Sequence, residues 1–68
     1  MKKIISNNVN ELRTKMGVTQ EKLAVALGVT RQTIIAIERG NYSPSVLLAL
    51  KLAQFFKEPV EKIFSTKK

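Results

Sequence analysis

Residues 20–39 read QEKLAVALGVTRQTIIAIER, and this stretch decides the fold. Its apolar residues recur at helical spacing on both sides of Gly28-Val29-Thr30, which predicts two short helices joined by three residues. Because the connection is so short and contains glycine, the two helices are expected to cross steeply. Ala24 is small where the helix backbones must approach, and Gly28 stands where the chain reverses and a positive φ is expected. The stretch therefore predicts one crossed pair of helices.

Outside this stretch, glycine and proline residues mark the ends of further helices. The candidate N-cap residues are Ser6, Asn7 or Asn8 for the first helix, then Thr19, Thr30 and Ser45. The predicted fold is all-α, a single domain over residues 1–68 with its core at 7–64 and helices near residues 9–16, 20–27, 31–39, 46–57 and 59–64. The ends, residues 3–6 and 64–66, favour extended structure, so they either pair as a short antiparallel β-ribbon or remain a frayed coil.

The composition excludes several classes of function. The 68 residues include 12 Lys and Arg against 5 Asp and Glu, a net charge of +7, and no His or Cys. Catalysis by histidine or cysteine and a typical zinc site are therefore excluded, and we predict no catalytic residues, no metal and no cofactor. The positive charge favours an anionic partner, with nucleic acid ahead of a membrane surface. Since the longest apolar run, residues 46–50, is too short to span a bilayer, we expect a cytoplasmic protein without a membrane partner.

The crossed pair has the spacing of a helix-turn-helix over residues 20–39. The chain continues with NYSPS at 41–45, ALKLA at 49–53 and EPVEKIF at 58–64, and with residues 18–40 it resembles the Xre family of phage-repressor and Cro-like regulators. The resemblance covers residues 7–64, and the subgroup is the small stand-alone type similar to the cytolysin repressor. It implies a five-helix domain that binds double-stranded DNA in the major groove, acting as a homodimeric transcriptional repressor on a palindromic operator.

A recognition helix places its N-terminal residues against base edges in the major groove. Arginine can donate two hydrogen bonds to guanine and glutamine can pair with adenine, so Arg31 and Gln32 suit this position. Helical spacing puts Ile35, and less directly Ala36, on the same outer face, where they suit thymine methyl groups. The alternative is that these are solvated residues without a DNA contact. The predicted base contacts are Thr30, Arg31, Gln32, Thr33, Ile35 and Ala36.

The resemblance implies two further sets of roles. It places the N-terminus of the second helix and the turn after the recognition helix against the DNA backbone. The predicted phosphate contacts are therefore Thr19, Gln20, Asn41 and Tyr42. Arg13 and Glu38 match a structural ion pair that joins the first helix to the third and orients the recognition helix.

The helix near residues 46–57 carries more apolar side chains than one buried face needs. We expect its core face to consist of Val46, Ala49, Leu50, Ala53 and Phe56. The remaining apolar stripe is covered either by the terminal segments or by a second protomer, and the homodimer is the better fit. Together with two residues of the fifth helix, the predicted dimer interface is Leu48, Leu52, Phe55, Ile63 and Phe64.

Alternative functions use the same features differently. An antitoxin would repress its own operon and bind a toxin through the apolar stripe. A membrane-surface module needs a strongly basic apolar helix, and an enzyme needs clustered catalytic groups, neither of which the sequence favours. Four positions depart from the family pattern by being apolar where it is usually polar or charged: Val25, Ala26, Ile35 and Leu47.

The net charge is spread unevenly along the chain. Residues 19–45 contain three basic and two acidic residues, so they contribute only +1 of the total. Polar contacts rather than net charge are therefore expected to carry recognition. The terminal lysines would add long-range attraction or solubility, and they are Lys2, Lys3, Lys67 and Lys68.

Overall fold

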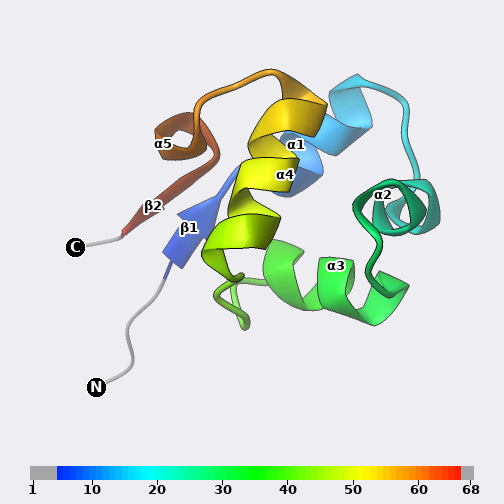
Figure 1. Cartoon of the computed structure of the whole chain (residues 1–68), viewed down its shortest axis with the longest axis horizontal. Coiled ribbons are helices and arrows are strands. Elements are labelled where there is room, and N and C mark those ends of the chain that lie inside the picture. The colour runs from blue at the N-terminus through cyan, green and yellow to red at the C-terminus, as the bar shows by residue number, and fades with distance from the viewer. Residues whose placement is uncertain (1–4, 67–68) are drawn as a thin grey trace.

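The computed structural model describes residues 5–66, and in these the chain forms five helices and a two-stranded antiparallel sheet (Figure 1). In chain order the elements are β1 (Ile5–Asn7), α1 (Val9–Lys15), α2 (Gln20–Leu27), α3 (Arg31–Glu38), α4 (Val46–Phe56), α5 (Val60–Ile63) and β2 (Phe64–Thr66). The ribbon and α5 lie toward one end of the long axis, α2 lies at the other end, and α4 runs between them. The predicted all-α, five-helix fold is confirmed.

Hydroxyl side chains set the starts of three helices. Thr19, Thr30 and Ser45 each accept a hydrogen bond from the backbone N–H three residues later, as the sequence predicted. Gly28 ends α2 with a φ of 74°, in the left-handed region that glycine adopts without steric cost. The steep crossing of α2 and α3 therefore rests on local signals that the sequence alone reveals.

Residues 5–7 and 64–66 pair as an antiparallel ribbon instead of remaining a coil. Register partners are Ile5 with Thr66, Ser6 with Ser65 and Asn7 with Phe64. The parts of the expected strand at residues 3 and 4 lie outside the described residues, as do the four terminal lysines. Pro59 precedes α5 as its N-cap residue instead of occupying the first turn.

One face of each helix contributes to a single hydrophobic core. Its buried side chains are Val9, Leu23, Ala24, Leu27, Ile34, Ile37, Leu48, Leu52, Phe56 and Ile63. The recognition-helix candidate α3 contributes Ile34 and Ile37, so its opposite face is free to meet a partner. The rings of Phe55 and Phe56 meet in a T-shaped, edge-to-face arrangement, with their centroids 5.3 Å apart.

The predicted core face of α4 is wrong at Val46 and Leu50, although Phe56 is buried as predicted, and three of the five residues predicted at the dimer interface lie in the protomer core. Leu48 is 7% exposed and Leu52 is fully buried, whereas Val46 is 76% and Leu50 52% exposed. Ile63 is also buried in the protomer core. The two other residues predicted at the interface, Phe55 and Phe64, are partly buried against the core.

The reason for this error is that α4 is apolar almost all round. Its sequence, VLLALKLAQFF, offers two apolar stripes, and helical periodicity cannot choose between them. Packing against α2 and α5 makes that choice in the folded chain. The exposed apolar side chains of α4 are therefore Val46, Leu47 and Leu50, which we call the α4 patch.

Candidate nucleic-acid interface

The predicted base contacts lie at the start of α3 and along its outer surface, and they differ in exposure. Arg31 and Gln32 are exposed in the first turn. Ile35 and Ala36 are half-buried one turn further along. Thr30 Oγ1 accepts a hydrogen bond from the backbone N–H of Thr33 and so caps the helix, and the two threonine hydroxyl oxygens lie 3.1 Å apart. The first turn of α3 thus presents one long cationic and one long amide side chain to solvent on a rigidly capped helix.

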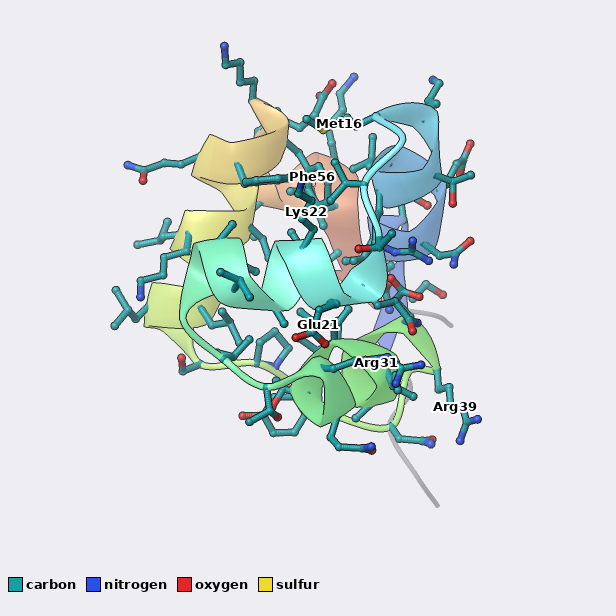
Figure 2. All side chains as sticks on the ribbon, turned by 90° about the vertical axis from the view of Figure 1, so that its right-hand side faces the viewer. Met16, Glu21, Lys22, Arg31, Arg39 and Phe56 are labelled. Atoms are coloured by element: carbon teal, nitrogen blue, oxygen red, sulfur yellow. The ribbon has the colours of Figure 1, made fainter. Side chains whose placement is uncertain are left out.

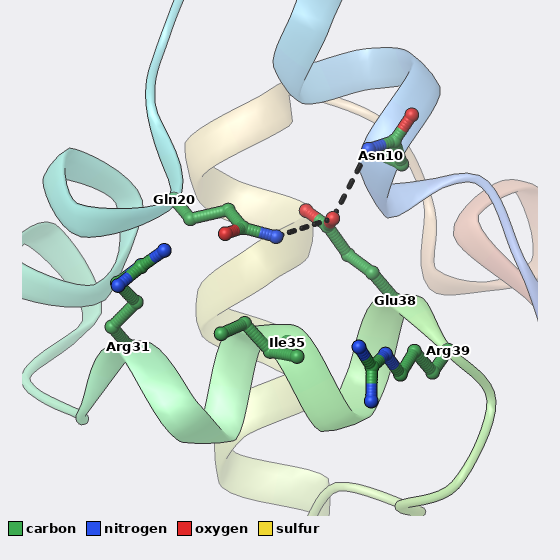
Figure 3. Close-up of a pocket in the computed structure, with 6 residues that line it drawn as sticks. All are labelled: Asn10, Gln20, Arg31, Ile35, Glu38 and Arg39. Atoms are coloured by element: carbon green, nitrogen blue, oxygen red, sulfur yellow. Dashed lines mark hydrogen bonds between the residues drawn. The ribbon is translucent and has the colours of Figure 1, made fainter.

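A hollow of about 420 Å³ lies beside α3 on this face (Figure 3). Its lining comes from three helices: Asn10 of α1, Gln20 of α2, and Arg31, Ile35, Glu38 and Arg39 along α3 and its end. Figure 3 shows Arg31, Ile35 and Arg39 following one another along α3. The N-terminus of α2 and the outer face of α3 therefore border the same space.

Glu38 holds the three helices together at this hollow. Its Oε2 accepts a hydrogen bond of 2.6 Å from Arg13 Nε, so the expected ion pair is present. Its Oε1 accepts hydrogen bonds from Asn10 Nδ2 at 3.1 Å and from Gln20 Nε2 at 3.0 Å. Arg13 also donates from Nη1 to the backbone oxygen of Val18, 2.9 Å away. One carboxylate therefore fixes α1 and α2 relative to α3.

The surroundings of Glu38 favour its charged form. Burial alone would raise the pKa of Glu38, but hydrogen bonds from Arg13, Asn10 and Gln20 and the charge of Arg13 outweigh it. The pKa of this carboxyl is therefore lowered from its ordinary value of 4.5. Glu38 is ionised at neutral pH, and its negative charge pairs with Arg13 within the protein.

Gln20 has a structural partner that the sequence did not predict. One N–H of its side-chain amide donates to Glu38, and an amide nitrogen carries two such donors. The hydrogen bond holds the side chain at the N-terminus of α2, where the helix dipole favours an anion. This geometry suits the proposed phosphate contact, with one donor holding the side chain and the other available.

Arg39 is a residue that the sequence reasoning missed. It is exposed at the end of α3 and lines the same hollow as Arg31. Figure 2 looks onto α2 and α3 and shows both arginines projecting from α3. The signal was present in the sequence, because Arg31, Ile35 and Arg39 repeat at four-residue spacing and so share one face of a helix.

The turn after α3 faces a different hollow. Asn41 and Tyr42 are both exposed, as a backbone contact requires. Tyr42 lines a second hollow of about 220 Å³ together with Val29, Thr33 and Leu47. The predicted site residues therefore border two different hollows, and α3 contributes to the lining of both.

No helix among the described residues is long and apolar enough to cross a membrane. The part of the chain that the structure describes also lacks a group of acidic side chains that could hold a metal ion.

A helix-turn-helix family model matches residues 9–63 of this chain. The HTH-type transcriptional regulator YgzD of Bacillus subtilis is 52% identical over 60 residues, which are 88% of this chain and 91% of that protein. The HTH-type transcriptional regulator MJ0272 of Methanocaldococcus jannaschii shows the same identity and coverage. The transcriptional repressor RstR of a cryptic CTXphi phage in Vibrio cholerae is 32% identical over 62 residues, 91% of this chain and 56% of that protein.

Two solved structures share the fold. The restriction-modification controller protein C.AhdI from Aeromonas hydrophila aligns with a TM-score of 0.73 and 34% identity, over 81% of this chain and 83% of that chain. The SOS-response transcriptional repressor LexA from Eubacterium rectale aligns with a TM-score of 0.80 and 28% identity, over 90% of this chain and 65% of that one.

Proposed function

This chain belongs to the Xre-like helix-turn-helix family of DNA-binding transcriptional regulators, and from that premise we propose that it is a repressor that binds a palindromic operator as a homodimer. The observation that carries the proposal is the first turn of α3. Arg31 and Gln32 are exposed there on a capped helix that contributes to the lining of two hollows. The similarity to a protein named as a transcriptional repressor supports repression rather than activation.

We assign base recognition to the outer face of α3. Arg31 donates to guanine and Gln32 pairs with adenine in the major groove, while Ile35 and Ala36 contact thymine methyl groups. The hydroxyl groups of Thr30 and Thr33 share a hydrogen bond, so the main role of these two residues is to hold the first turn of α3 in place. Recognition then depends on polar and apolar contacts from α3, because residues 19–45 carry a net charge of only +1.

Phosphate contacts flank the recognition helix on both sides. The second amide N–H of Gln20 and the Thr19-capped N-terminus of α2 hold one phosphate. Arg39 adds a guanidinium beside the same hollow. Asn41 and Tyr42 hold the backbone after the end of α3. Contacts of this kind set the register of the helix on the duplex without reading sequence.

The homodimer uses the α4 patch in place of the interface that the sequence predicted. Val46, Leu47 and Leu50 are between 52% and 76% exposed, which is costly for large apolar side chains in a lone small domain. A twofold axis through this patch would bury it, and the dimer would carry two copies of α3. In an antitoxin the same patch would hold a toxin, and a stable homodimer of the purified chain would argue against that alternative.

The test of the assigned base contacts is a pair of substitutions at Arg31. Arg31→Ala is expected to weaken binding to an operator duplex by about fivefold to 150-fold, because a bidentate base contact contributes roughly 1–3 kcal/mol. Arg31→Lys keeps the charge but loses the planar fork, so it should lose specificity while the salt dependence of binding stays near that of the wild type. Titration of both variants across a salt series measures this. Unchanged specific and non-specific affinities in Arg31→Ala would show that the assignment is wrong.

A further inference from the structure

Asn7 connects three parts of the fold at the inner end of the β-ribbon. It is the last residue of β1 and is half-buried. Its Oδ1 accepts a hydrogen bond of 3.1 Å from the backbone N–H of Val9, at the start of α1. Its Nδ2 donates at 2.8 Å to the backbone oxygen of Ile37, thirty residues away in the last turn of α3. One side chain therefore joins the ribbon and α1 to the end of the recognition helix.

The carbonyl that Asn7 reaches belongs to the motif that ends α3. Gly40 has a φ of 78°, and its N–H donates to the Ile37 oxygen at 2.9 Å. The N–H of Asn41 reaches back to the Ala36 oxygen at 3.0 Å, which completes a Schellman motif. Asn7 supplies a second donor to the Ile37 oxygen, which has two lone pairs to accept both. This side chain thus fixes the turn that leads directly into Asn41 and Tyr42.

We propose that Asn7 is a positioning residue for DNA recognition, a proposal that rests on the function proposed above. The helix α3 has only eight residues, so a small movement of its last turn also moves the base-contacting face. Binding geometry of this kind has to be held to within about half an ångström. Glu38 holds the last turn of α3 from the side of α1 and α2, and Asn7 holds it from the ribbon. Operator affinity therefore depends on a side chain that does not contact DNA.

The sequence offers a matched pair of substitutions to test this. Asn7→Asp keeps the oxygen that accepts from Val9, but it removes the donor to Ile37 and sets a carboxylate against that carbonyl. Asn8→Asp makes the same chemical change in the next residue, where Nδ2 donates at 2.8 Å to the backbone oxygen of Lys62 in α5. Both variants lower the net charge by one, so any general effect of charge on DNA binding is common to them.

The expected result is that Asn7→Asp weakens binding to the operator duplex about three- to tenfold more than Asn8→Asp. Non-specific affinity for a scrambled duplex and the salt dependence should be alike in the two variants, which simple loss of folded protein would not produce. The role of Asn7 would be overturned if the two variants bound the operator equally well. It would also be overturned if Asn7→Asp alone lost specific and non-specific binding in parallel. If Asn7→Asp proves poorly folded, Asn7→Ser repeats the comparison, since its hydroxyl can cap α1 but is too short for Ile37. Wild-type protein that does not distinguish the two duplexes would instead overturn the proposed function.

Discussion

Leu52→Ala is expected to lower the free energy of unfolding by about 2–5 kcal/mol, because it leaves a cavity where a fully buried side chain stood. A single small core of this size supplies only about 3–5 kcal/mol in total. The variant should therefore keep little of its stability and unfold at a much lower urea concentration than the wild type. Urea unfolding followed by circular dichroism measures the change.

Leu50→Ala is the matched control, because it makes the same change two residues earlier on α4. Leu50 is 52% exposed, so its loss should change the stability of the protomer by no more than about 0.5 kcal/mol. The same variant should weaken the homodimer, which sedimentation over a range of protein concentrations detects. Equal destabilisation by the two substitutions, or the reverse order, would show that the assigned core face of α4 is wrong.

Glu38→Ala is expected to cost up to about 3 kcal/mol, because it leaves the largely buried Arg13 guanidinium without its carboxylate. Asn10 and Gln20 lose their acceptor in the same step. Glu21→Ala, at an exposed position of α2, should cost less than about 1 kcal/mol. Denaturant unfolding of the two variants at neutral pH makes the comparison. A cost for Glu38→Ala no greater than that for Glu21→Ala would contradict the role of the ion pair.

The lowered pKa of Glu38 also predicts how stability depends on pH. A carboxyl whose pKa is lower in the folded chain stabilises fully above its ordinary value of 4.5 and loses this contribution as the pH falls through the folded-state value. Wild-type stability should therefore fall on acidification below about pH 5. The stability of Glu38→Gln should fall less steeply over the same pH range, since the other carboxylates contribute equally in both proteins. If stability falls equally steeply with pH in the two proteins, Glu38 does not contribute to the loss of stability in acid.

Much of the fold follows from local signals in the sequence. Thr19, Thr30 and Ser45 begin their helices because a hydroxyl can accept from the third N–H, and Gly28 ends α2 because glycine tolerates positive φ. These interactions lie within a few residues of each other along the chain. They can therefore be predicted without knowing the tertiary structure.

What could not be predicted depends on residues that meet only in the folded chain. The sequence of α4 allows two apolar faces, and packing against its neighbours decides between Leu50 and Leu52. Asn7 was a candidate helix cap, yet its bond to Ile37 spans thirty residues. Gln20 was expected to meet phosphate only, and its bond to Glu38 requires the crossing of α2 over α3 to be known.

The proposed function requires α3 to read base pairs of a symmetric DNA site. Selection of bound duplexes from a random-sequence library by the purified wild-type protein tests it most directly. We expect an enriched palindrome whose two half-sites are centred about one helical turn apart, roughly 10–10.5 base pairs, with guanine at a conserved half-site position. The same selection with Arg31→Lys should lose that guanine. Failure of the wild-type protein to enrich any sequence above the starting library would contradict the claim.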